Sequence, residues 1–360
     1  MGVRGKGRDP ASPPAEAPGG PFSGRDRARS AGVAKRPDTF YKKMDVMEIP
    51  EQAPIYELIS DPKASQVLPS LGVIIAQLQD LTGTADTRVQ QITELIRADQ
   101  SLTVKMLRLA NSAFYAPAEP ILHIDEVVIF LGLGQVRNAI LTSKLIEQSS
   151  TIPSELLSWH DFWVHEMATA VILQELSTHM KETRMTGEAY YVMGLFHDIG
   201  KLVLAMLAPD LFTRVLWETA QKRCDLSPVE IERVGLNHAS IGAWYLQQQG
   251  LPPSLYEAIR IHHSWSYSPG NGDEAAMISL ADQIAHLFRL GASGTFFPEG
   301  WNPGESPEWA AFREMCGPML PAWPDLLLEM WEKAGHVPAL LDTLASGVKL
   351  RTMEGVTRAG

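Results

Sequence analysis

The stretch that decides the fold is Ala189-Tyr-Tyr-Val-Met-Gly-Leu-Phe-His197-Asp198-Ile-Gly-Lys201, in which an apolar segment runs directly into a His-Asp pair. Neutral imidazole and carboxylate are good ligands for a divalent metal ion, and such an ion activates water as a nucleophile. Lys201 follows His197 by four residues. On a continuous helix its ammonium would lie over the same face and bind a phosphate oxygen. A buried histidine at a helix end is the simpler interpretation of an isolated pair, so the metal hypothesis depends on partners elsewhere.

Further histidine and carboxylate side chains lie in other segments with helical periodicity, namely His165, His238, His262, His263 and Asp282. Helices of a bundle project such side chains into a shared interior. Asp282 interrupts an otherwise apolar face, and a buried carboxylate needs a partner, which a metal ion supplies. His262 and His263 point about 100° apart on a helix. One of them therefore faces the cluster while the other turns toward a second metal ion, substrate or solvent, and the sequence does not decide which.

Asp161 stands one turn before His165, in a segment whose pattern predicts a helix over 153–180 capped by Ser154. A carboxylate in this position either orients the histidine or joins the ligand set. An ordinary pair of side chains four residues apart on a helix surface is an equally good interpretation. Both interpretations stay open at this point.

Apolar residues spaced three and four apart predict helices through most of the chain from residue 55. Asp99 and Asp125 are candidate helix caps in the first part of the chain. Ser227 before Pro228 predicts the start of a later helix. The Gly-, Pro- and Trp-rich stretch 291–325 predicts a loop that wraps the bundle before the last helices.

Residues 1–43 form a basic arm, with ten Lys or Arg against four acidic residues, while the whole chain carries a formal charge of −11. The arm has much Pro, Gly and Ser and few large apolar residues, so it cannot offset its ordering entropy and we predict that it is disordered. The rest of the chain is strongly acidic. Nucleic acid is therefore an unlikely partner, because sequence-independent binding requires neutralisation of phosphate charge.

The composition is that of an ordinary globular protein, with 45% hydrophobic and 20% charged residues in 360. Cys224 and Cys316 are the two cysteines and form no closely spaced pair, which favours a reduced, cytoplasmic protein. We find no apolar run near 18 residues and no apolar signal core at the N-terminus. The sequence therefore predicts no transmembrane segment.

Several motifs in order carry a family resemblance through about residues 60 to 290. The chain resembles the HDOD (HD-related output domain) branch of the HD superfamily, and the motifs are Leu68-Pro69-Ser-Leu, Ala98-Asp99-Gln-Ser-Leu-Thr103, Leu107-Arg-Leu-Ala-Asn111-Ser112-Ala-Phe-Tyr115, Phe130-Leu-Gly132, Phe162-Trp163-Val-His165, Gly194-Leu-Phe-His197-Asp198-Ile-Gly200-Lys201, Glu230 with Gly235-Leu-Asn-His238-Ala-Ser-Ile-Gly242, and Ile261-His262-His263.

The resemblance implies an all-α protein in which an HD-type helical bundle, 151–290, is preceded by an N-terminal helical subdomain, 55–150. A Pro- and Trp-rich loop with helices, 291–360, follows the bundle. Proteins of this family are bacterial signalling modules, so the resemblance also implies a regulatory role in signal transduction.

The resemblance implies a ligand set as well. In the wider HD superfamily the matching residues hold one divalent metal ion, here His165, His197, Asp198 and Asp282. His238, with His262 or His263, would serve a second ion or the substrate phosphate. The expected cofactor is thus one or two divalent ions of Mn, Fe or Mg. The candidate catalytic residues are Lys201, Asp198 and His238.

Two function classes stay open. In the first, the protein is an output module that binds a divalent metal and regulates through a signalling protein partner, as many HDOD members are thought to do. In the second, it is a metal-dependent phosphohydrolase acting on a nucleotide or cyclic dinucleotide, with Lys201 and His238 stabilising the charge that develops. The related HD-GYP proteins follow their paired histidines with Glu and a Gly-Tyr-Pro loop. This chain has His262-His263-Ser264-Trp265 instead, which argues against cyclic di-GMP hydrolysis and not against metal binding.

Overall fold

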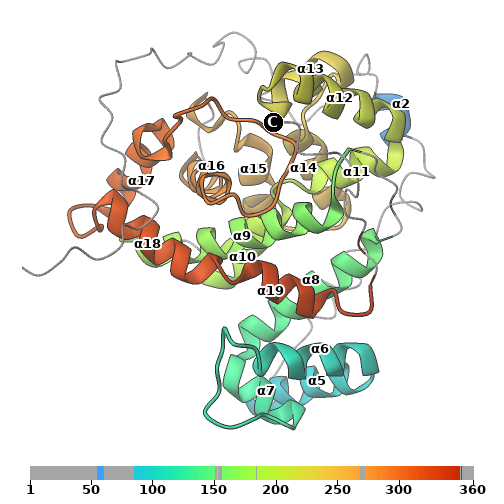
Figure 1. Cartoon of the computed structure of the whole chain (residues 1–360), viewed down its shortest axis with the longest axis vertical. Coiled ribbons are helices and arrows are strands. Elements are labelled where there is room, and N and C mark those ends of the chain that lie inside the picture. The colour runs from blue at the N-terminus through green and yellow to red at the C-terminus, as the bar shows by residue number, and fades with distance from the viewer. Residues whose placement is uncertain are drawn as a thin grey trace, which may run out of the picture. The chain divides into compact units, whose positions relative to one another are not determined.

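The computed structural model describes residues 55–60, 85–150, 152, 156–183, 185–267, 272–348 and 350 (Figure 1). All described residues belong to one compact unit, Lys42–Gly360. The predicted disorder of residues 1–43 therefore lies outside the described residues. Within those residues every regular element is a helix, as the predicted all-α class requires.

In the described part of the N-terminal subdomain, α5 and α6 pack on α7, which packs on α8. Asp99 caps α6 as predicted, since its side chain accepts a hydrogen bond from the Leu102 N–H at 3.1 Å. Asp125 does not cap α7. Its carboxylate instead forms an ion pair with Arg97 at 2.5 Å, so electrostatic pairing with α5 takes the place of the predicted cap. The bounds are α5 Ala85–Arg97, α6 Gln100–Ala110, α7 Ile124–Leu131 and α8 Leu133–Ser149, and a short α2, Tyr56–Ser60, precedes them.

The HD-type bundle is built around α9 and α10, which pack along each other, while α16 packs against α9 and α11 crosses α14. The crossing of α11 and α14 depends on Gly200, because a Cβ there would lie 1.9 Å from the His238 carbonyl oxygen. The close approach brings the start of α11, just after the His-Asp pair, against the start of α14, where His238 stands. The bounds are α9 Trp159–Thr178, α10 Gly187–Phe196, α11 Ile199–Leu207, α12 Pro209–Lys222, α13 Leu226–Val234, α14 His238–Gln248, α15 Pro253–Ile261, the 3₁₀ turn η1 Trp265–Tyr267 and α16 Gly272–Leu287.

Two predicted helix starts differ from the structure. Helix α9 begins at Trp159 and is capped by Ser158, whose hydroxyl accepts from the Asp161 N–H at 3.2 Å, so the predicted start at 153 was too early. Ser154 lies outside the described residues. Helix α13 is capped by Asp225 and not by Ser227. The hydroxyl of Ser227 is buried in the first turn and accepts a hydrogen bond from Asn237 at 3.0 Å, which leaves the capping role to the carboxylate.

The stretch 291–325 is not all loop as predicted. Helix α17 lies within it and begins with a side-chain cap from Ser306 followed by Pro307 at the first position, a strong start signal that the composition obscured. The last helices, α18 and α19, follow this stretch as expected and pack against α9, and α19 also contacts α6 and α8. The bounds are η2 Pro303–Glu305, α17 Pro307–Cys316, α18 Trp323–Ala334 and α19 Val337–Leu344.

One stretch, Gly187–Leu207, is long and apolar enough by composition to cross a membrane, although the sequence predicted none. It comprises α10 and α11, and 83% of its most apolar window is buried inside the protein. Such burial is typical of core helices, so the stretch is weak evidence for a membrane span.

Candidate metal centre

The His-Asp pair lies at a break between two helices. Helix α10 ends at Phe196, and α11 begins at Ile199. Because the helix is interrupted here, the ammonium of Lys201 does not lie over His197, as a continuous helix would have placed it. The Nζ atom of Lys201 forms an ion pair with Asp198 Oδ2, and both side chains are buried.

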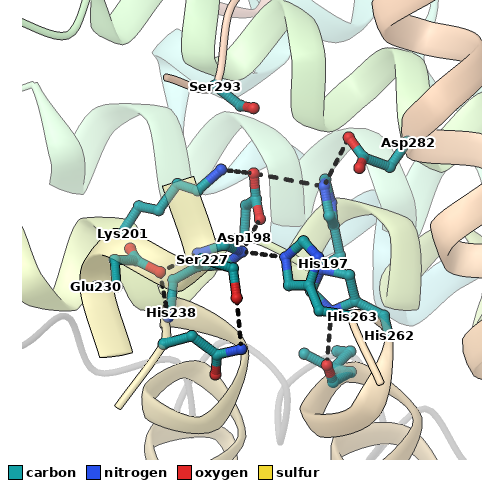
Figure 2. Close-up of polar contacts among 12 residues, drawn as sticks. His197, Asp198, Lys201, Ser227, Glu230, His238, His262, His263, Asp282 and Ser293 are labelled. Atoms are coloured by element: carbon teal, nitrogen blue, oxygen red, sulfur yellow. Dashed lines mark hydrogen bonds and ion pairs between the residues drawn. The ribbon is translucent and has the colours of Figure 1, made fainter. Parts of the chain in front are cut away.

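Three histidines of the centre are oriented in the same way, by a contact at Nδ1. In each, Nδ1 meets an acceptor, which assigns the proton to Nδ1 and leaves the lone pair of Nε2 for another partner. This is how proteins usually orient a metal-binding histidine. The pairs are His197 with the Gly194 carbonyl at 2.8 Å and His262 with the Ile259 carbonyl at 2.7 Å. The third pair is His238 with the Glu230 carboxylate at 2.6 Å (Figure 2).

The Nε2 atoms of these histidines lie near Asp198 or near one another. His238 Nε2 is 2.9 Å from Asp198 Oδ1 and 2.8 Å from the Nε2 atom of His263. His197 Nε2 is 3.5 Å from Asp198 Oδ2. The Nε2 atoms of His197 and His262 are buried and have no hydrogen-bond partner among the described residues.

The remaining predicted ligand, His165, contacts Asp282 on the other side of His197. The Nε2 atom of His165 lies 2.9 Å from Asp282 Oδ1, and His197 Nε2 lies 3.8 Å from the same oxygen. Asp282 thus has the histidine partners that its place on an apolar face demanded. Its side chain is 12% exposed, whereas that of His165 is fully buried.

The structure brings all seven candidate metal ligands into one centre. Potential ligand atoms lie within 4.8 Å of one another in three overlapping groups, and both His262 and His263 take part. Asp198 belongs to two of the groups. They are Asp198, His238, His262 and His263; His165, Glu166, His197 and Asp198; and His165, Asp282 and His286.

Asp161 is not part of the centre. Its side chain is 51% exposed and lies 3.3 Å from the ring of His160. The alternative in which Asp161 orients His165 or joins the ligand set is therefore wrong, because the side chain points outward from the start of α9.

Three residues of the centre had no predicted role, namely Glu166, Glu230 and His286. Glu166 follows His165 in the middle of an apolar helix, which is a signal in itself, and its carboxylate lies 3.3 Å from His197 Nδ1. Glu230 belongs to a motif already quoted for the family resemblance. His286 stands one turn after Asp282 on α16, the same spacing that was considered for Asp161, and its Nε2 lies 3.4 Å from Asp282 Oδ1.

Burial and charge act in opposite directions on the pKa values of the centre. Burial alone would lower the pKa of His197, but the charges of Asp198 and Glu166 raise it well above its usual value. Burial alone would also lower the pKa of His238, but the charges of Glu230 and Asp198 raise it to about 9. Burial, with the nearby His197 and His238, lowers the pKa of His262 to about 3. The centre therefore holds strongly coupled charges in a dry interior.

Asp198 stays ionised in this setting. Its burial favours the neutral acid, but His197, Lys201 and His238 hold the pKa of its carboxyl well below the usual range. The pKa of Lys201 is raised, because Asp198 outweighs the effect of burial. In contrast, burial raises the pKa of Glu166. An ionised carboxylate shared between two groups of histidines is well suited to bridge cations.

An all-helical bundle with a buried histidine and aspartate centre defines the class of protein. The HDOD domain family matches residues 68–265, more than half of the chain, and the chain therefore belongs to the HDOD family.

Solved structures of similar fold support this membership. An HDOD domain protein of unknown function from Geobacter sulfurreducens is 24% identical, with a TM-score of 0.65, and the match covers 77% of this chain and 92% of that one. A candidate phosphohydrolase from Shewanella amazonensis is 22% identical, with a TM-score of 0.60 and coverage of 80% and 98%. A candidate metal-dependent phosphohydrolase from the same organism is 19% identical, with a TM-score of 0.53 and coverage of 79% and 98%. At these identities the likeness shows the shared fold.

A curated relative from Treponema pallidum, an uncharacterized protein, is 22% identical over 205 residues, or 56% of this chain. The match spans 39% of the length of that relative. The chain thus shares one part of a longer protein.

Proposed function

We propose that this HDOD protein binds one or two divalent metal ions at its histidine and aspartate centre and acts as a signal-transduction output module through a protein partner. The observation that carries the metal proposal is the pair of buried Nε2 atoms, on His197 and His262, that lack hydrogen-bond partners among the described residues, while their Nδ1 atoms each meet a carbonyl oxygen. An unpaired buried polar atom costs about 1–3 kcal/mol. A metal ion would use both atoms as ligands.

The charge of the centre supports the same proposal. The centre contains one buried ammonium, that of Lys201, which pairs with Asp198, and four buried carboxyl groups, those of Glu166, Asp198, Glu230 and Asp282. A buried excess of acidic groups needs compensation by cations. Protons on the histidines supply some of it, and a divalent ion supplies more. Metal binding at this centre should therefore displace protons.

The residues fall into two donor sets that share Asp198. One set would use His238, His262 and His263 with Asp198, whose ligand atoms form one group. The other would use His165 and His197 with Asp198, joined by Asp282, whose Oδ1 lies 2.9 Å from His165 Nε2 and 3.8 Å from His197 Nε2. Imidazole and carboxylate donors together suit Mn, Fe and Zn ions.

The partner-binding part of the proposal is supported by the family resemblance. A cytoplasmic location agrees with the free state of Cys224 and Cys316.

Metal-dependent phosphohydrolysis is the second candidate function, and the sharing of Asp198 between two donor sets favours it. A bound ion would lower the pKa of a coordinated water toward 7 and polarise a phosphate oxygen. Lys201 keeps its positive charge beside Asp198 and would hold a phosphate oxygen. With one ion held by His165, His197, Asp198 and Asp282, His238 would not be a ligand and, oriented by Glu230, would donate a hydrogen bond or a proton to the phosphate at Nε2.

The metal proposal is tested by the metal content of His197→Ala against His123→Ala, since His123 is exposed and lies on the N-terminal subdomain. We expect His197→Ala to lose metal while its helical circular dichroism is kept and His123→Ala to match the parent. Equal metal in both variants would show that the centre is misassigned.

The enzymatic alternative predicts phosphate release from a nucleotide or cyclic dinucleotide with Mn²⁺, and loss of this activity in Lys201→Met. No turnover by fully metal-loaded protein would favour the output-module function.

A further inference from the structure

Three histidine nitrogens surround one oxygen of Asp282. The Nε2 atoms of His165, His286 and His197 lie 2.9, 3.4 and 3.8 Å from Asp282 Oδ1. Figure 2 shows Asp282 directed at the His197 side of the centre. Three imidazole nitrogens gathered on one carboxylate oxygen form a compact donor set, because an ion that binds that oxygen lies close to all three rings.

His286 is held in this position from three sides. It stands one turn after Asp282 on α16, so both side chains share a face of the helix. Its ring centroid lies 4.5 Å from that of His165 and 4.9 Å from that of Phe297. Its Nε2 atom also lies 3.1 Å from the hydroxyl of Ser293. The side chain is 12% exposed, so its orientation is restrained by packing.

The segment that carries Ser293 is itself fixed against α9. Gly291 has φ 72°, and a Cβ there would lie 2.0 Å from the Asp161 carbonyl oxygen. The next residue, Ala292, donates its N–H to that same carbonyl at 3.1 Å. Only glycine fits such a close approach with positive φ. The contact therefore ties the segment after α16 to the start of the helix that carries His165, and it places Ser293 beside His286.

We propose that His286 is a metal ligand, and that with His165, His197, Asp282 and the shared Asp198 it makes a site of three imidazoles and two carboxylates that prefers Zn²⁺ or Fe²⁺ to the harder ions Mn²⁺ and Mg²⁺. The inference rests on the proposed metal function and specifies the chemistry of one of its ions. Imidazole donors suit zinc and iron. Mg²⁺ requires oxygen ligands in octahedral geometry and retains several waters.

The test measures Zn²⁺ and Mn²⁺ affinity by competition with a chromophoric chelator, in the parent and in His286→Ala, His286→Asp, Asp282→Ala and His123→Ala. Asp282→Ala identifies the ion in question, because Asp282 belongs to one donor set and not to the other. We expect His286→Ala to weaken Zn²⁺ binding at that same ion at least about tenfold. His286→Asp replaces nitrogen by oxygen and should shift the Zn²⁺ to Mn²⁺ affinity ratio toward Mn²⁺. His123→Ala should match the parent.

A direct role is separated from a positioning role by added imidazole and by Ser293→Ala. Free imidazole should restore Zn²⁺ affinity to His286→Ala, since the removed ring reaches the partly exposed edge of the centre. Ser293→Ala should not lower the affinity, because the Ser293 hydroxyl meets the same Nε2 atom of His286 that the ion would use, whereas a loss would indicate that His286 acts only as a positioning residue. Parent affinity and an unchanged Zn²⁺ to Mn²⁺ ratio in both His286 variants would overturn the inference and leave the metal centre standing. A parent that binds no metal would instead refute the proposed function.

Discussion

In the N-terminal subdomain Lys105 is buried among α6, α8 and α19, whereas in the bundle Lys201 is buried beside Asp198. Their exposures are almost equal, at 2% and 1%. The Nζ atom of Lys105 donates to the Ser143 hydroxyl at 3.0 Å, with no carboxylate in hydrogen-bond contact among the described residues. Burial therefore lowers the pKa of Lys105, while Asp198 raises that of Lys201. Equal burial thus produces opposite electrostatics, and the neighbouring groups decide whether a buried lysine keeps its charge.

The same contrast extends to the rest of the two regions. The Ser143 hydroxyl in turn donates a hydrogen bond to the Leu344 carbonyl oxygen at 3.4 Å, at the end of α19. The Ser143 hydroxyl therefore accepts one hydrogen bond and donates another within the protein. In the bundle, Lys201 belongs to a cluster in which His197 Nε2 and His262 Nε2 make no hydrogen bond to any residue that the structure describes. A polar cluster that the protein does not complete by itself is a candidate for binding something else.

The largest expected effect comes from Asp198→Ala. Removal of this carboxylate leaves Lys201 as an uncompensated buried charge, which should lower the free energy of unfolding by roughly 3–5 kcal/mol in denaturant titrations. The double variant Asp198→Ala with Lys201→Met is the control. It should recover most of the lost stability and still bind no metal. If the free energy of unfolding of the single variant falls by less than about 1 kcal/mol, the charge of Lys201 does not depend on Asp198, and the proposed difference between the two lysines is wrong.

A smaller loss is expected for Gly200→Ala, which tests the crossing of α11 and α14 that brings the His-Asp pair to His238. The added Cβ would meet backbone at 1.9 Å, so the helices must move apart. We expect a destabilisation of roughly 1–3 kcal/mol and weaker metal binding. Gly272→Ala is the matched control, because its Cβ would meet its nearest neighbour at an ordinary 3.6 Å. Similar thermal midpoints for the two variants would contradict the proposed importance of this crossing.

The smallest effect is expected for Lys105→Met, within about 1 kcal/mol of the parent at pH 7 and with unchanged metal content. The folded pKa of Lys105 is lowered below its unfolded value, so the unfolded state binds more protons between the two values. The parent should therefore gain stability relative to Lys105→Met as the pH rises toward 10.5. The difference in unfolding free energy, measured from pH 7 to 10, checks the sign. A falling difference would mean that Lys105 has an acidic partner.

Sequence reasoning predicted the helical class and most helices of the bundle, because apolar periodicity and motif order are local signals. It also selected the seven residues that the structure brings into one centre, Asp198 among them. It misplaced Lys201, because the break between α10 and α11 depends on the packing of Gly200 against α14 and not on a local signal. Ser227 looked like a cap from its neighbour Pro228, yet Asp225 reaches the free N–H groups first. These errors share a cause, since each depends on tertiary contacts.

The missed members of the centre have a similar explanation. His286 has the same four-residue spacing from Asp282 that Asp161 has from His165, but only His286 faces inward. The difference arises from rotation of α9 and α16 about their axes, which the sequence does not determine. Glu166 carried a readable signal, a charged residue within an apolar helix, because such a residue needs a buried partner.

The most direct test of the account is elemental analysis of protein purified without chelator or affinity metal, with the parent compared to Asp198→Ala with Lys201→Met. The double variant removes the carboxylate shared by both donor sets and avoids the unpaired lysine. We predict one or two equivalents of a transition metal in the parent and none in the variant. No metal in the parent, even after reconstitution with Mn²⁺, Fe²⁺ or Zn²⁺, would contradict the account and make the centre a hydrogen-bonded core.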